Sequence, residues 1–135
     1  MERIKIDDGS KTYEIVNLDD QVIGTFTFNP SDANIIKRYE SVVDAIQEYA
    51  AKDEPMTPEL LNEAQELITQ KVSELVGVDT SKTFFSICGA LSPMANGNLY
   101  VLNVIEALGA VIEKETNHRM KKVNAKMNKY LEGYK

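Results

Sequence analysis

The sequence is poor in the residues that most often carry enzyme chemistry, with one cysteine and one histidine in 135 residues. Cys88 cannot form an intramolecular disulfide, which fits a reducing compartment, and it lies beside Ile87 without a nearby basic residue to activate its thiol. His118 lies in a polar segment and has no second histidine with which to build a triad or a metal site. We therefore expect no catalytic residue, no metal and no cofactor.

Long apolar runs are also missing. Residues 1–10 lack the apolar stretch of an export signal, so we expect a cytoplasmic protein. The charge-free segment 83–105 is interrupted by serine, asparagine and proline, which predicts a buried or partner-covered segment and no membrane span. Hydrophobic residues still make up 43% of the chain, enough for the core of a single domain over residues 1–135.

Charge is unevenly distributed along the chain. Residues 114–135 hold seven basic and two acidic residues, a net of +5, although the whole chain carries −6. Residues 1–113 therefore carry −11. Such an acidic body repels nucleic acid and anionic membranes, whereas the basic end attracts both, or attracts the acidic body of a second copy.

An α+β fold is predicted, in which a small antiparallel β-meander over residues 2–28 packs against a mainly helical body over residues 30–118. Phe26 and Phe28 share one face of the last strand, and we expect a helix to cover them. The three expected strands are centred on Ile4 and Ile6, on Tyr13–Val16 and on Val22–Phe28.

Helix boundaries are marked by several capping signals. Asn29 is a good N-cap and Pro30 suits the first helical position, so we expect a helix from Pro30 whose apolar stripe lies on the sheet. A second helix is expected to begin at Thr57-Pro58 and to end at Gly77. Residues 83–91 predict a short third helix.

The last predicted helix starts near Leu99 and is unusually long. Its apolar pattern meets polar residues at 113–119 and then resumes, which leaves its continuity open. One continuous helix of about 30 residues would extend roughly 45 Å, longer than a domain of this size needs. Residues 119–135 therefore form a basic amphipathic helical tail that either projects from the body or packs back on the core.

A projecting tail could bind a partner protein, a second copy or an anionic surface, because flexible methionine side chains adapt to varied apolar partners. A tail packed on its own core, with its lysines in solvent, would explain the same pattern. The alternative function is a nucleic-acid-binding or regulatory module, although no reading motif accompanies the lysines. An enzyme would need a carboxylate-lined cleft that the sequence does not disclose.

The segment Phe26–Glu40, FTFNPSDANIIKRYE, joins a strand to Asn29-Pro30-Ser31-Asp32 and places Lys37-Arg38-Tyr39 in the following helix. This segment resembles small phage and prophage proteins that act as tail assembly chaperones. The resemblance implies a non-enzymatic chaperone or scaffold that binds and solubilises the long, helical tape-measure protein during tail morphogenesis in the bacterial host cell. Self-association would arrange several copies along that partner.

Partner-binding residues are expected on the first helix and on the tail. On the first helix they are Arg38 and Tyr39. On the tail they are Met120, Lys121, Lys122, Val123, Lys126, Met127, Lys129 and Tyr130.

Overall fold

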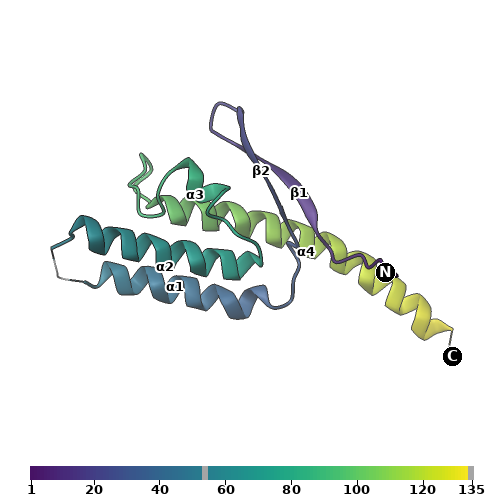
Figure 1. The fold of residues 1–135 in the computed structure, drawn as a ribbon. Coiled ribbons are helices and arrows are strands. Elements are labelled where there is room, and N and C mark those ends of the chain that lie inside the picture. Colours follow the sequence, from purple (N-terminus) through teal and green to yellow (C-terminus); the bar gives the residue numbers. More distant parts are fainter. Residues whose placement is uncertain (53–54, 134–135) are drawn as a thin grey trace.

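The computed structural model describes residues 1–52 and 55–133 as a narrow β-hairpin attached to a group of helices (Figure 1). The helices α1 and α2 lie side by side, and α4 extends well beyond them. A mixed fold of an antiparallel sheet and helices, with a long C-terminal helix, is thus confirmed. The sequence left the continuity of that helix open, and the structure shows it uninterrupted. The elements are β1 (Lys11–Val16), β2 (Val22–Phe28), α1 (Ile35–Ala50), α2 (Pro58–Val76), α3 (Phe84–Ile87) and α4 (Tyr100–Glu132). Residues 134–135 of the predicted tail lie outside the described residues.

The hairpin follows the predicted alternation of faces. Tyr13 of β1 lies opposite Phe26 of β2 in an antiparallel register. Phe26 and Phe28 are 3% and 2% exposed, whereas the threonines that alternate with them are exposed. In the connecting turn, the side-chain Oδ1 of Asn17 accepts hydrogen bonds from the backbone N–H groups of Asp19 and Gln21, both at 3.0 Å. Such side-chain bonds to the nearby backbone are typical of asparagine in tight turns.

The predicted first strand is wrong, because residues 1–10 lie in no strand and the sheet of the described chain has two strands. The carboxylates of Asp7 and Asp8 accept hydrogen bonds from the backbone N–H groups of Gly9 and Ser10 at 3.0 and 2.9 Å. These local bonds turn the backbone just before β1 and compete with ladder formation. The isoleucines at positions 4 and 6 are exposed, so their alternation has no buried face that would fix a register.

The core lies where the helices and the aromatic face of the hairpin meet. Val42, Val72 and Val101, one from each long helix, are fully buried. The ring of Phe26 packs edge-on against Phe84 of α3, with 4.8 Å between ring centroids. The prediction that α1 lies on the sheet is not met, because α1 packs chiefly against α2. A ribbon of two strands is too narrow to support a helix of 16 residues along its length.

The first helix begins five residues later than predicted, at Ile35 and not at Pro30. Asn29 accepts a hydrogen bond from the backbone N–H of Ser31 through its side chain, and Asp32 accepts one from Asn34, both at 3.0 Å. These two successive side-chain turns compete with helical hydrogen bonds. We call residues 29–34 the β2–α1 loop.

Both predicted ends of α2 are confirmed. The Thr57 hydroxyl accepts a hydrogen bond from the backbone N–H of Leu60 at 3.2 Å. Gly77 adopts the left-handed conformation, with φ of 77°, and its N–H donates to the carbonyl of Ser73. The short helix α3 ends at Ile87 and does not reach residue 91, because the following backbone bonds to other elements: the N–H of Leu91 donates to the side chain of Gln65.

Replacing the central aromatic residue of the hairpin tests this description of the core. Phe26→Ala should lower the free energy of unfolding by about 3–5 kcal/mol, because it removes a buried ring and leaves a cavity. Thr25→Ala, on the exposed face of the same strand, should change it by less than about 0.5 kcal/mol. Urea unfolding followed by circular dichroism measures both, and equal effects of the two changes would contradict the assignment of the buried face.

Candidate functional site

The helix α4 continues past the core. Leu108 is its last buried residue, at 5% exposure, and partly buried residues continue as far as Arg119. All described residues from Met120 onward are exposed, so this part of the helix does not pack back on the body. We call residues 120–132 the α4 tail. At about 1.5 Å per residue it is about 20 Å long.

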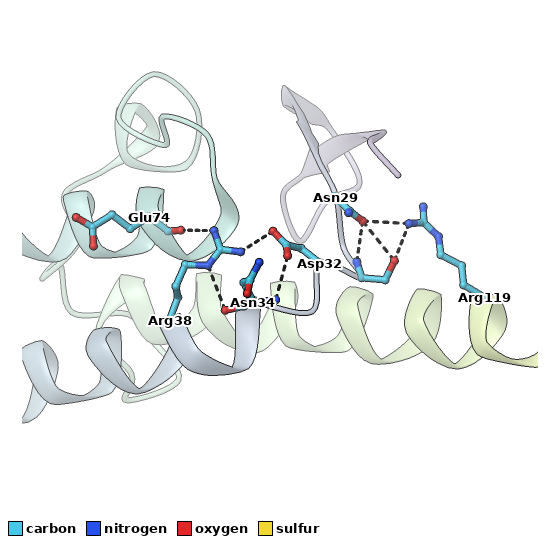
Figure 2. Close-up of polar contacts among 7 residues, drawn as sticks. Asn29, Asp32, Asn34, Arg38, Glu74 and Arg119 are labelled. Carbon is cyan, nitrogen blue, oxygen red and sulfur yellow. Dashed lines mark hydrogen bonds and ion pairs between the residues drawn. The ribbon is translucent and has the colours of Figure 1, made fainter. Parts of the chain in front are cut away.

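Polar contacts mark the point where α4 leaves the body. The Arg119 Nη1 donates to the side-chain oxygens of Asn29, at 3.1 Å, and Ser31, at 2.7 Å, both in the β2–α1 loop (Figure 2). One helical turn earlier, Glu115 accepts a hydrogen bond from Lys11 of β1 at 2.9 Å. This bond from Lys11 is the main reason that the pKa of the Glu115 carboxyl lies below its usual value. These contacts fix the direction of the α4 tail relative to the hairpin.

The α4 tail carries two parallel rows of side chains. Members of each row recur every three or four residues, so each row follows one side of the helix. Each lysine of the second row immediately precedes a member of the first, which separates the two rows by a rotation of about 100°. The apolar row is Met120, Val123, Met127 and Tyr130, whose exposures are 47%, 47%, 50% and 60%. The basic row is Lys122, Lys126 and Lys129.

All predicted binding residues of the tail except Lys121 therefore lie on the apolar row or on the basic row. Lys121 is exposed but lies on neither row, two residues before Val123 and one before Lys122. The basic row forms no ion pair with any described residue. Its lysines thus have their charges available to an external partner.

Arg38 was predicted to bind a partner, and the structure gives it three contacts within the chain (Figure 2). Its Nη2 lies 2.6 Å from the carboxylate of Asp32, and its Nη1 donates to the backbone carbonyl of Glu74 near the end of α2, at 2.9 Å. Its Nε donates to the carbonyl of Asn34 at 3.2 Å. Arg38 thus joins the β2–α1 loop to both α1 and α2, while its role in partner binding stays a prediction.

Tyr39, the other predicted residue of α1, follows Ile36, which lines a small apolar depression, by three residues. Tyr39 is 44% exposed and Ile36, on the same side of α1, is 81% exposed. Ile36 also lines a cavity of about 270 Å³ between α1 and α4, together with Ile112 and Thr116 of α4. Thr116 precedes Met120 by one helical turn, so this depression leads to the start of the apolar row.

Sequence reasoning missed a wide groove along α2, with a volume of about 830 Å³. Its acidic residues are Glu66, Glu74 and Asp79, and none of the described residues that line it is basic. Phe85 and Val78 give it an apolar part. Glu66, Gln70 and Glu74 recur every four residues, and this spacing was the available signal. Without the opposite segment 78–90, which contains α3, the spacing is typical of an ordinary exposed helix face.

The side chains that could take part in catalysis lie on the surface or among packing residues in this structure. His118 is exposed on α4, and Cys88 is half-buried. The Tyr100 hydroxyl donates to the carbonyl of Phe84 at 2.8 Å, and burial raises the pKa of Tyr100 to about 12.

Within residues 1–52 and 55–133, no group of histidine, cysteine and acidic side chains could hold a metal ion. Across the same residues, every helix is too short or too polar to cross a membrane.

Comparison with known proteins gives no relative: no family model, no curated protein and no solved structure matches this chain. The geometry of the α4 tail is therefore the structural observation from which a function can be proposed.

Removing the guanidinium of Arg38 tests its role as a link between elements. Arg38→Ala should lower the free energy of unfolding by about 2 kcal/mol, because it leaves a carboxylate and two carbonyls without their partner. Lys37→Ala removes a neighbouring exposed charge and should change it by less than about 0.5 kcal/mol. Chemical unfolding measures both, and a neutral Arg38→Ala would contradict the assigned role.

The loop carboxylate of Asp32 makes stability depend on pH. The backbone N–H of Asn34, and then the side chain of Arg38, hold the pKa of Asp32 below 3.8. A lowered folded-state pKa stabilises the fold above the unfolded value, and this contribution is lost as the pH falls below about 3.8 through the folded value. Asp32→Asn should therefore cost stability at pH 7 and lose less on acidification than the unchanged chain.

Unfolding in urea at a series of pH values between neutral and strongly acidic checks this expectation. Asp44→Asn, which removes an exposed carboxylate from α1, is the control for the change in net charge. Parallel pH profiles for the unchanged chain and Asp32→Asn would contradict the role given to the loop carboxylate.

Proposed function

We propose that this chain is a non-enzymatic tail assembly chaperone or scaffold of a phage or prophage, which binds and solubilises the tape-measure protein in the cytoplasm of the bacterial host. The observation that carries the proposal is the exposed apolar row on the α4 tail. The resemblance of Phe26–Glu40 to tail assembly chaperones supplies the identity of the partner.

The apolar row suits a helical partner. Met120, Val123 and Met127 follow a spacing of three and four residues, which is the pattern by which one amphipathic helix lies along another. Methionine side chains are unbranched and adapt to partners of varied shape. A chaperone that covers many successive segments of a long protein needs such adaptable contacts more than it needs a single specific pocket.

The depression between α1 and α4 extends this surface toward the body. Ile36 and Ile112 line it, and Thr116 connects it to Met120 along one side of α4. From Ile112 to Tyr130 the path covers 18 helical steps, about 27 Å. Tyr39, exposed on α1, lies on the same side of that helix as Ile36, three residues away. A partner helix of about five turns would fit along this path.

The contacts proposed here are weak one by one. Three half-exposed apolar side chains contribute at most a few kcal/mol of binding free energy, at about 25 cal/mol for each Å² that is buried. Such contacts allow later replacement by the subunits of the tail tube. Several copies bound along one partner would still hold it strongly, because their contributions accumulate.

Replacing the apolar row tests the proposed function. The chain is co-expressed with the tape-measure protein of the same phage, and the soluble amount of that protein is measured. The variant Met120→Ser/Val123→Ser/Met127→Ser should weaken binding by about tenfold or more, because most of the apolar contact area is lost. The soluble yield of the tape-measure protein should fall accordingly.

A matched control uses the third side of the same tail. Asn124→Ser/Asn128→Ser/Glu132→Ser introduces the same number of serines, one every four residues, and should leave the yield unchanged. Circular dichroism of both variants verifies that the helix content is equal. A tape-measure protein that stays insoluble with the unchanged chain, or stays soluble with the apolar-row variant, would overturn the proposal.

A further inference from the structure

The basic row of the α4 tail is a second surface, separate from the apolar row. Lys122, Lys126 and Lys129 lie about 100° around the helix from the apolar side chains that follow them. A helix bound along the apolar row would therefore leave these lysines in solvent. Ala125 lies between them on the same side, three residues after Lys122 and four before Lys129. Its small side chain lets another surface approach the helix closely.

The groove along α2 has the complementary charge. Glu66 and Glu74 lie two turns apart on α2, about 12 Å along the axis, and Asp79 follows in the loop beyond Gly77. Lys71 offers only a loose ion pair to Glu74, at 3.7 Å, while Glu66 forms none with the described residues. The basic row covers seven helical steps, about 10.5 Å, so the two charged surfaces have similar lengths.

The groove cannot be filled by the tail of the same molecule. α4 is one uninterrupted helix of 33 residues, and its tail points away from α2 and α3 (Figure 1). The two complementary surfaces of one molecule therefore remain apart, and they can meet only between molecules.

We infer that the basic row of one copy docks in the acidic groove of the next copy. Lysine ammonium groups would pair with Glu66 and Glu74, while their aliphatic stems cover the apolar part of the groove formed by Phe85 and Val78. The contact joins two different surfaces, so each copy keeps one free groove and one free tail. Repetition of such a contact builds a ring or an open filament.

Charge favours a second copy over nucleic acid as the occupant. Residues 1–113 carry −11, and this body repels a phosphate backbone that approaches the tail. The same charge attracts the +5 of residues 114–135 in a neighbouring copy. This contact between copies rests on the proposed scaffold role, in which head-to-tail copies would present their apolar rows at regular intervals. The contact itself involves different side chains from the partner-binding row.

Two charge-reversed variants of the full chain test the contact. The tail variant is Lys122→Glu/Lys126→Glu/Lys129→Glu, and the groove variant is Glu66→Lys/Glu74→Lys. Sedimentation velocity should show that the unchanged chain forms larger species as its concentration rises, and that about 1 M salt, where the Debye length is about 3 Å, dissociates them. Each variant alone should associate at least about tenfold more weakly, because ion pairs become like-charge contacts.

An equimolar mixture of the two variants should recover association, because each reversed tail then meets a groove of opposite charge. Lys37→Glu/Lys52→Glu, which changes net charge on α1 and just after it, should behave as the unchanged chain. A groove variant that associates normally by itself would overturn the inference in favour of tail-to-tail contact. A mixture that stays monomeric would overturn it as well.

Two further results distinguish docking of the basic row in the groove from nucleic-acid binding and from association through the apolar row. An unchanged chain that stays monomeric in low salt, yet retards a 20-base-pair DNA duplex on a gel, would overturn the inference in favour of nucleic acid. The apolar-row variant Met120→Ser/Val123→Ser/Met127→Ser should still associate with itself, even if it no longer solubilises the tape-measure protein. Self-association that is lost in this variant but kept in the tail variant would overturn the assignment of the basic row.

Discussion

Two arginines form hydrogen bonds to one short loop, and through it they connect the hairpin to three helices. Arg38 holds the β2–α1 loop through Asp32 and reaches the end of α2, while Arg119 holds the same loop through Asn29 and Ser31 (Figure 2). Hydrogen bonds to a charged group contribute about 1.5–3 kcal/mol each when shielded, and less at this junction, because the side chains of Arg38 and Asp32 are 28% and 34% exposed. This polar junction therefore links the hairpin, α1, α2 and α4, and it adds to the constraint that the packed core already places on their orientation.

The segment Phe26–Glu40 thus contributes structure more than surface. Its phenylalanines are buried, its loop side chains accept hydrogen bonds from the two arginines, and Arg38 donates to backbone carbonyls of the same chain. Replacing Asn29, Asp32 or Arg38 would in each case leave a polar group of this junction without its partner. The segment therefore connects structural elements, and most of its polar side chains form contacts within the chain.

Sequence patterns predicted the regular parts of the fold and failed where side chains compete with the backbone. The ends of α2 follow from Thr57 and Gly77 because capping is local. The start of α1 was misplaced because Asn29, a sound N-cap by residue type, forms a turn with Ser31. The rows of the α4 tail could be recognised from their spacing. The groove could not, since one of its walls comes from segment 78–90, which is brought against α2 by long-range contacts such as the bond from Leu91 to Gln65.

Because α4 is uninterrupted, its tail is already helical before it meets a partner, and this lowers the conformational entropy lost on binding. Isolated helices of about 12–15 residues are marginal in water because the first turn is costly to nucleate. The α4 tail has 13 residues, but its first turn continues a helix that is already held by the core and by Arg119. Its backbone is therefore ordered before any contact is made, and binding does not have to supply the conformational entropy that an unfolded basic peptide of the same sequence would lose.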